Sequence, residues 1–238
     1  MYGYGYYGMM FDPTIVLVLI GVVITLAASA KVNGTFNKYS HVRSKTGMTG
    51  AEVAIRLLQS QGIYDVTVQA VSGKLTDHYD PRTKTVNLSQ SVYNQTSVAA
   101  IGVAAHECGH AIQDHKEYVP LRLRAAIVPA ANIGQQISWP LILFGVIIGG
   151  LGSPLVQIGI LCFSLAVLFQ LVTLPVEFDA SARAVRLLDS TGILAEDEVK
   201  ITKKVLGAAA MTYVAGAASA VLQLLRLVLL FGGNRRDD

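Results

Sequence analysis

The chain has 238 residues, of which 52% are hydrophobic and 15% are Asp, Glu, Lys or Arg, whereas ordinary soluble domains carry about 25% charged residues. This composition is typical of a membrane protein that also has a compact polar part. The net charge of +3 is small and no basic run alternates with aromatic residues, which argues against a nucleic-acid partner. Cys108 and Cys162 are the only cysteines in the sequence, and their positions predict no disulfide framework.

The first predicted element is an apolar helix over residues 13–31. Residues 1–12 form a Tyr- and Gly-rich tail without Lys or Arg, which differs from a typical cleaved signal peptide. The uncharged run from Pro13 to Ala30 is long enough to cross a bilayer core, which needs about 17–25 apolar residues. Lys31 and Lys38 follow this run and no basic residue precedes it. The positive-inside bias therefore predicts that the tail lies outside and that the next region lies in the cytoplasm.

Residues 32–132 are expected to form a cytoplasmic α+β part that carries the catalytic motif. A short amphipathic helix is predicted within 49–62, because a helix-start pattern leads into a periodic apolar run that ends at a glycine. Two alternating runs, at 66–71 and 85–88, predict the strands of a small sheet. The strand that contains Asn87 either lies at a sheet edge, where an extended peptide could pair with it, or belongs to an ordinary hairpin that shields the site.

The stretch from His106 to His110 reads His-Glu-Cys-Gly-His and follows an apolar run that predicts a buried helix. On a helix, the two histidines lie four residues apart on one face with Cβ atoms about 5–6 Å apart, close enough to share one metal ion. Histidine is scarce in this chain, at 5 of 238 residues, so a chance match to this pattern is rare. The embedded Glu107 is placed to act as the general base beside the metal.

A hairpin of two apolar helices is predicted after the motif, over residues 133–174. The two runs are separated by the helix-breaking stretch from Gly149 to Pro154. The hairpin contains about forty nearly uncharged residues, and a bilayer crossing needs about 20. This favours a transmembrane hairpin with an external turn over a buried helix pair in a soluble core. The chain would then return to the cytoplasmic side, where the motif lies.

Residues 175–204 are expected to complete the metal site. A hydrolytic zinc site takes three protein ligands and leaves one position for water, so the two histidines need a third partner. Glu177 shares a helix face with small residues that would allow close packing against the motif helix, whereas Asp179 is spaced to pair with Arg183. We therefore predict Glu177 as the third ligand, with Asp179 as the alternative.

The last segment, residues 205–238, contains an apolar helix that continues to residue 231. This helix is long enough to form a fourth span, but it contains Arg226 and is followed by two further arginines. Because those arginines would lie outside, against the positive-inside bias, a helix that lies in the membrane interface is the alternative. Tyr213 in this segment, or less favourably Arg226, is a candidate donor to the oxyanion that forms during peptide hydrolysis.

Two stretches, Ala104–Gln113 and Leu174–Ala182, together with the intervening hairpin, resemble the YugP-type neutral zinc metallopeptidases, which are bacterial membrane zincins. The resemblance covers nearly the whole chain. It implies a zinc cofactor with three ligands and one catalytic residue: His106, His110 and Glu177 as ligands, and Glu107 as the catalytic residue.

The order of the parts is also similar to that of the HtpX-type membrane proteases. In those proteases an Asp follows the Glu ligand by four residues, whereas this chain has Ser181 at that position. The side chain that orients the histidine rings is therefore left open, with Asp179 as a candidate.

Together these features predict a mainly α fold with a small β-sheet. A transmembrane helical hairpin is expected between the metal motif and the third ligand. The protein would be an integral membrane, zincin-like metallopeptidase. We expect a zinc-dependent endopeptidase in the plasma membrane of a bacterium, with its active site on the cytoplasmic side. The expected partners are the lipid bilayer, a peptide or protein substrate, and either a membrane partner protein or a second copy of the chain. The alternative is a non-catalytic membrane scaffold with a structural zinc site, which four protein ligands would indicate.

Overall fold

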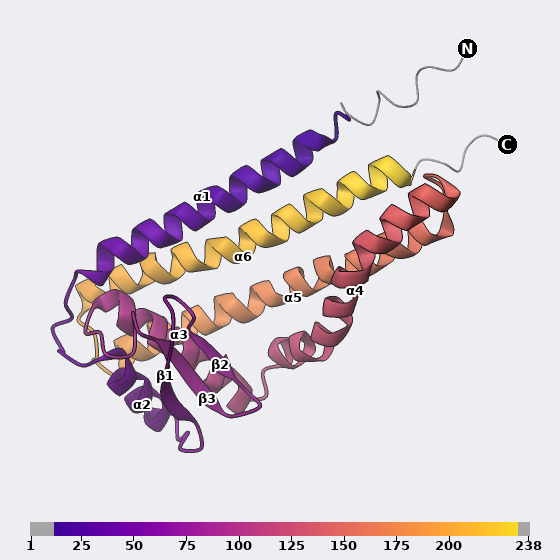
Figure 1. Cartoon of the computed structure of the whole chain (residues 1–238). Helices are drawn as coiled ribbons and strands as arrows, with labels where there is room; N and C mark the ends of the chain where they lie inside the picture. The colour runs from indigo at the N-terminus through magenta and orange to yellow at the C-terminus, as the bar shows by residue number, and fades with distance from the viewer. Residues whose placement is uncertain (1–11, 233–238) are drawn as a thin grey trace, which may run out of the picture. The chain divides into compact units, whose positions relative to one another are not determined.

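The computed structural model describes residues 12–232, and within them the fold is mainly helical with one small sheet, as the sequence predicts (Figure 1). The elements in chain order are α1 (Ile15–Ser40), α2 (Gly50–Ser60), β1 (Thr67–Val71), β2 (His78–Asp80), β3 (Thr85–Ser89), α3 (Val98–His115), α4 (Val119–Gly149), α5 (Pro154–Ser190) and α6 (Glu196–Phe231). The tail expected over residues 1–12 lies, except for Asp12, outside the described residues.

The chain divides into two compact units. Among the described residues, a helical unit comprises 12–27, 124–172 and 214–232. An α/β unit comprises Ala28–Leu123 and Thr173–Tyr213. The helices α1, α4, α5 and α6 each contribute one part of their length to each unit.

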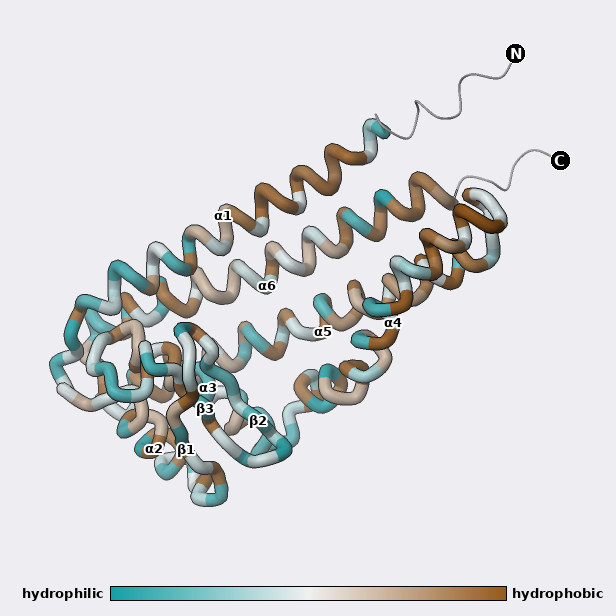
Figure 2. Tube along the Cα trace, in the orientation of Figure 1, coloured by the Kyte–Doolittle hydropathy of each residue, from teal (hydrophilic) through white to brown (hydrophobic). Residues whose placement is uncertain are grey.

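The helical unit is built from apolar helix segments. Among the described residues, α1, α4, α5 and α6 are long and apolar enough to cross a membrane, by length and composition, and Figure 2 shows hydrophobic stretches along them. Gly150, at a φ of 73°, follows the end of α4 in the left-handed conformation that glycine favours, and Pro154 then begins α5. The helix-breaking stretch therefore forms the tight turn of a helical hairpin. Four buried apolar side chains pack together in this unit: Ile142, Val156, Leu227 and Phe231.

The α/β unit has its core between α2, α3 and the sheet. The side chain of Thr49 accepts a hydrogen bond from the amide of Glu52, whose carboxylate accepts one from the amide of Thr49, so α2 begins with a capping box. Ser97 caps α3 by accepting from the amide of Ala100. The largest fully buried apolar side chains of the core come from α2, the sheet, α3 and α5, and include Leu57, Leu58, Leu88, Ile101, Ile112 and Leu188.

The sheet has the order β1-β3-β2, with β1 parallel and β2 antiparallel to β3. Asn87 on β3 is opposite Gln69 of β1 on one side and His78 of β2 on the other. Of the two alternatives for the Asn87 strand, a sheet edge is therefore wrong, because both of its sides already have strand partners. The sequence pattern also missed β2, which is only three residues long and forms the hairpin with β3.

The motif helix α3 and the helix α5 approach each other at a glycine. A Cβ atom added to Gly109 would lie 2.5 Å from the carbonyl oxygen of Ala180 and 3.0 Å from its Cα atom. The small residues expected on the Glu177 face of α5 thus lie against Gly109, as the sequence predicts. Gly102, the other glycine of α3, does not contact α5; its nearest neighbour is Thr202 of α6.

We expect Gly109→Ala to destabilise the protein by about 1–3 kcal/mol, because the added methyl group must push the α5 backbone away from α3. The matched control is Gly34→Ala, also in a helix, where an added Cβ atom meets nothing within 4 Å. This control should be neutral or stabilising by up to about 1 kcal/mol. Thermal unfolding of the purified variants measures both effects, and equal melting temperatures for the two would contradict the close approach of α3 and α5.

Candidate metal centre

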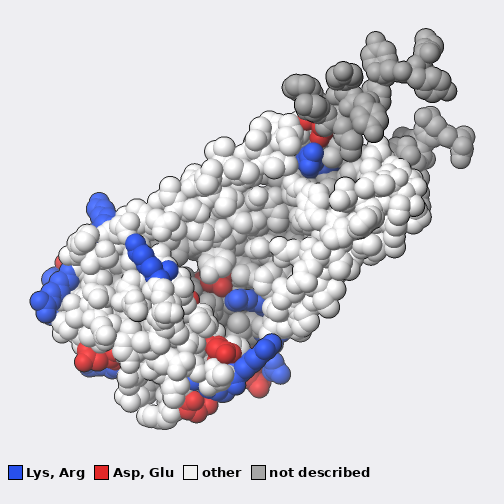
Figure 3. Space-filling model, in the orientation of Figure 1, with Lys and Arg blue, Asp and Glu red and all other residues white. Residues whose placement is uncertain are grey.

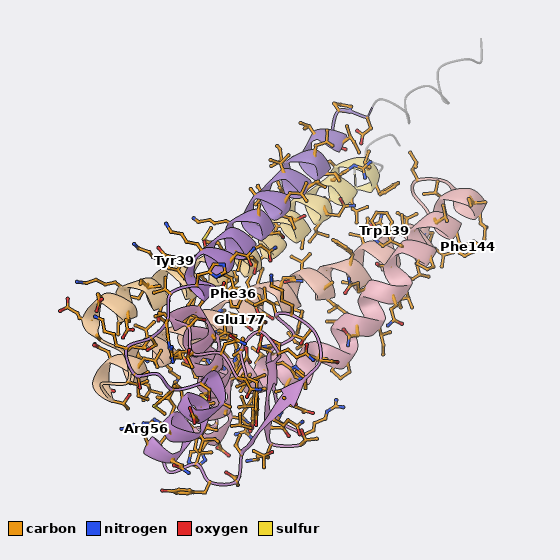
Figure 4. All side chains as sticks on the ribbon, turned by 60° about the vertical axis from the view of Figure 1, so that its left-hand side comes forward. Phe36, Tyr39, Arg56, Trp139, Phe144 and Glu177 are labelled. Atoms are coloured by element: carbon orange, nitrogen blue, oxygen red, sulfur yellow. The ribbon has the colours of Figure 1, made fainter. Side chains whose placement is uncertain are left out.

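Three potential metal ligands from α3 and α5 meet in the α/β unit. His106, His110 and Glu177 each offer one ligand atom, and these atoms all lie within 4.8 Å of one another. The Nε2 atoms of His106 and His110 lie 3.3 Å and 3.5 Å from the same carboxylate oxygen of Glu177, Oε2. Glu177 is 2% exposed and lies in the interior of the unit (Figure 4). The three donors therefore converge on one buried point.

The opposite edge of each imidazole ring is held by a second hydrogen bond. Ser181 Oγ lies 3.1 Å from Nδ1 of His106, and Gln113 Oε1 lies 3.0 Å from Nδ1 of His110. The amide nitrogen of Gln113 donates to the carbonyl of Val176, so its amide oxygen is the acceptor for His110. Nδ1 of His110 thus carries the proton, which leaves the lone pair of Nε2 directed at the metal position.

Asp179 takes part in the network that supports His110. Its carboxylate accepts hydrogen bonds from Gln113 Nε2, at 2.8 Å, and from Nε of Arg183 one helical turn later. The pairing of Asp179 with Arg183 matches the spacing in the sequence. Asp179 thus acts on His110 through Gln113, while Ser181 contacts His106 directly.

The donor set fits a zinc ion. Two imidazole nitrogens and one carboxylate oxygen form the His₂Glu set of hydrolytic zinc sites, which keep one position for water. Cys108 lies within the motif but is fully buried, and its thiol donates to the carbonyl of Ala54 on α2. Burial also raises the pKa of the Cys108 thiol, so the thiolate form that binds metals is disfavoured. The pKa of His110 is raised above its usual value: burial is the largest single influence and lowers it, but the hydrogen bonds to Glu177 and Gln113 and the charges of Glu107 and Glu177 together outweigh burial.

A cleft of about 230 Å³ opens beside these ligands. His106, Glu107 and Asp77 supply its polar lining, and Tyr213 lines it as well. Burial raises the pKa of Glu107 above its usual range, against the opposing effect of the two histidines. The remaining lining is apolar and comes from α1, α3, α6 and the segment before β2: Val32, Phe36, Leu75, Val103, Val205, Leu206 and Ala209.

The other candidate oxyanion donor, Arg226, belongs to the helical unit and does not line this cleft. It pairs with the carboxylate of Asp12 at 3.4 Å. Tyr213 is therefore the candidate donor that the structure places in the cleft with Glu107.

Sequence reasoning missed three residues of the site: Gln113, Ser181 and Asp77. Gln113 lies three residues after His110, a spacing that places the two side chains together on a helix. Ser181 was noted only as a departure from the HtpX-type pattern, although its place four residues after Glu177 puts it on the face of the ligands. Asp77 gives no comparable signal in the sequence. Its carboxylate is held beside the cleft because it accepts hydrogen bonds from the backbone amide and the hydroxyl of Ser89, twelve residues later. Burial raises the pKa of Asp77 as well.

Comparison with known proteins agrees with the resemblance found in the sequence. A family model described as "Putative neutral zinc metallopeptidase" matches residues 14–232, a range that contains the motif and Glu177. The chain is 45% identical over 224 residues to the "Putative membrane protease YugP" of Bacillus subtilis (strain 168). The aligned region covers 94% of this chain and 99% of that protein. No solved structure matches the chain.

We expect Ser181→Ala and Gln113→Ala each to weaken zinc binding about 10–100-fold, because each variant frees one histidine ring to rotate away from the metal position. Competition for zinc between the purified protein and a chromogenic chelator measures this affinity. Ser190→Ala is the matched control, since this serine is exposed and bonds only within its own helix. Zinc affinities equal to that of the unsubstituted protein in both site variants would show that the ring contacts do not support the metal.

Proposed function

Because the chain belongs to the family of neutral zinc metallopeptidases, we propose that it is an integral membrane endopeptidase that hydrolyses peptide bonds of membrane or membrane-proximal proteins. The position of Glu107 is the observation that carries this proposal. Glu107 lines the same cleft as His106, beside the point at which the three metal donors converge. A structural zinc site needs neither an acid nor an open cleft next to its ligands.

The residues of the site have separate tasks in the proposed reaction. Zinc, when bound, activates a water molecule and polarises the carbonyl of the scissile bond. Glu107 accepts the proton of the attacking water and then delivers it to the leaving amine, first as general base and then as general acid. Ser181 and Gln113 hold the two imidazole rings in place during these steps.

Tyr213 is proposed to stabilise the negative charge that develops on the former carbonyl oxygen. Its hydroxyl group can donate one hydrogen bond, and it lines the cleft together with Glu107. A donor in a water-poor cleft stabilises developing charge more than it would in bulk water.

The lining of the cleft supports a substrate close to the membrane. Val32 and Phe36 belong to α1, and Leu206 and Ala209 belong to α6. Both helices contain segments that are long and apolar enough to span a bilayer. An apolar cleft between such helices suits hydrophobic side chains in peptide segments at or near the bilayer surface.

We further propose that residues 13–31, both arms of the hairpin over 133–174, and the helix within 205–231 cross the plasma membrane of a bacterial cell. This assignment places the α/β unit in the cytoplasm, with the turn between α4 and α5 outside. Its support is the basic stretch that follows the first apolar run together with the apolar composition of α1, α4, α5 and α6.

Glu107→Gln should abolish peptide hydrolysis, with a fall of about 10²–10⁴-fold, because glutamine cannot accept the proton of the attacking water. Zinc binding should remain close to that of the unsubstituted protein, since Glu107 is not one of the three converging donors. Cleavage of a peptide library by zinc-loaded protein measures the activity, and Glu117→Gln on the exposed surface is the control. Full activity in Glu107→Gln would refute the proposed mechanism. A bound zinc with four protein ligands and no exchangeable water would instead favour the structural scaffold.

Tyr213→Phe should lower kcat by about 10²–10³-fold while leaving the zinc affinity unchanged, because the hydrogen bond to the developing oxyanion is removed and Tyr213 is not one of the three metal donors. Steady-state kinetics on a cleaved peptide, together with a zinc titration, separates these effects. Tyr64→Phe, at a tyrosine that is 78% exposed, is the control. An unchanged kcat in Tyr213→Phe would remove Tyr213 from the reaction.

The proposed orientation can be tested by cysteine labelling in intact cells. Cys162→Ser provides the background, because the remaining native thiol, Cys108, is fully buried. A membrane-impermeant maleimide should label Gly152→Cys, in the turn between α4 and α5, in intact cells. It should label Tyr64→Cys only after the membrane is permeabilised. The reverse pattern would place the α/β unit outside the cell.

A further inference from the structure

A second cavity of about 620 Å³ lies between α1 and α6 in the α/β unit. Its lining combines four lysines with small residues: Lys31, Lys38, Lys203 and Lys204 with Ala30, Gly34, Thr35, Tyr39, Gly207 and Ala208. We call this cavity the lysine groove. It differs from the catalytic cleft in every lining residue, although α1 and α6 contribute to both.

The four lysines of the lysine groove have no acidic partner among residues 12–232, whereas three other lysines of the chain do. Lys45 pairs with Asp197 at 2.8 Å, and Lys84 and Lys200 have partners at similar distances. Only Lys38 makes a charge-related contact, with its ammonium 5.4 Å from the centre of the Tyr39 ring. Four exposed ammonium groups around one cavity, none of them paired with an acid in the described part of the chain, therefore favour the binding of an anion.

One glycine on each helix lines the groove: Gly34 on α1 and Gly207 on α6. A Cβ atom added to Gly34 of α1 or to Gly207 of α6 would meet nothing within 4 Å. Glycine costs about 1 kcal/mol relative to alanine in a helix interior, and at neither position does a close neighbour require it. The space beside these two glycines is therefore open within the groove.

The groove lies at the polar end of two apolar helix segments. On α1, the uncharged run ends at Ala30 and Lys31 follows it directly. On α6, Lys203 and Lys204 come directly before the apolar run that begins at Val205. Figure 2 shows the corresponding change from hydrophobic to polar residues along α1, and Figure 3 shows Lys and Arg side chains on the surface at that end. Basic pockets between helices at this depth suit the headgroups of anionic lipids.

We propose that the lysine groove binds the phosphate-containing headgroup of an anionic phospholipid. The phosphate lies among the ammonium groups, and the glycerol moiety occupies the space beside Gly34 and Gly207. The site recognises the negative charge together with a lipid anchor held at the membrane boundary. A free phosphate ion shares the first feature and lacks the second.

Native mass spectrometry of the zinc-loaded full-length protein in detergent tests this proposal, with phosphatidylglycerol as the probe and phosphatidylcholine as the neutral comparison. The parent protein should retain one phosphatidylglycerol in preference to phosphatidylcholine. Lys203→Gln combined with Lys204→Gln should weaken retention about 30-fold, because each basic residue near an anionic lipid contributes a factor of about five. Gly207→Leu should weaken it at least tenfold without a change in charge, because the side chain fills the groove.

The control is Lys84→Gln combined with Lys116→Gln, which removes the same charge from exposed lysines outside the lysine groove. This variant should retain the lipid like the parent protein. Equal weakening in the control and in the lysine-groove variants would show general electrostatic attraction and overturn the proposal. Displacement of the lipid by inorganic phosphate at the same concentration would also overturn it, because the site would then recognise a free anion.

Discussion

The convergence of three side chains from two distant segments is the constraint on which the rest of the α/β unit depends. Two imidazole nitrogens of α3 and one carboxylate of α5 must lie within a few ångströms of each other in a buried position. Placing a carboxylate in such a position is unfavourable unless a cation or hydrogen bonds compensate for the lost solvation. The contact of Gly109 with the backbone of Ala180 allows this approach, and Gln113 links the two helices through Val176 and Asp179.

Much of this site could be predicted from the sequence, because helical periodicity alone places the residues. The spacing of His106 and His110 fixes their common face, and the small residues around Glu177 indicate the face of α5 that packs on α3. The sheet could not be predicted in the same way. β1 pairs in parallel with β3, although β2 lies between them in the sequence, and local alternation does not reveal which strands pair. The two alternatives at Asn87 stayed open for this reason: alternation indicates a strand, but it does not indicate whether the strand is central or at an edge.

The residues that support the metal ligands were missed for a related reason. Ser181 contacts His106 across the packing of α5 on α3, and Gln113 contacts His110 within one turn of α3. Serine and glutamine are ordinary helix residues, so neither marks a site by its type alone. The arrangement of α1 and α6 could not be predicted from the sequence either, because it depends on contacts between segments far apart in the chain. At about 3.6 residues per turn, the residues that line the catalytic cleft and those that line the lysine groove lie on opposite faces of α6 and on adjoining faces of α1. One pair of helices therefore contributes different faces to the cleft and to the positively charged cavity.

X-ray absorption spectroscopy of the zinc-loaded protein tests the central claim most directly, because it reports the atoms bound to the metal without requiring a known substrate. The His106, His110 and Glu177 set predicts nitrogen and oxygen neighbours at about 2.0–2.2 Å, two imidazole rings and no sulfur. Glu177→Gln should alter this spectrum or abolish zinc binding. A sulfur neighbour at about 2.3 Å, or an unchanged spectrum in Glu177→Gln, would contradict the account.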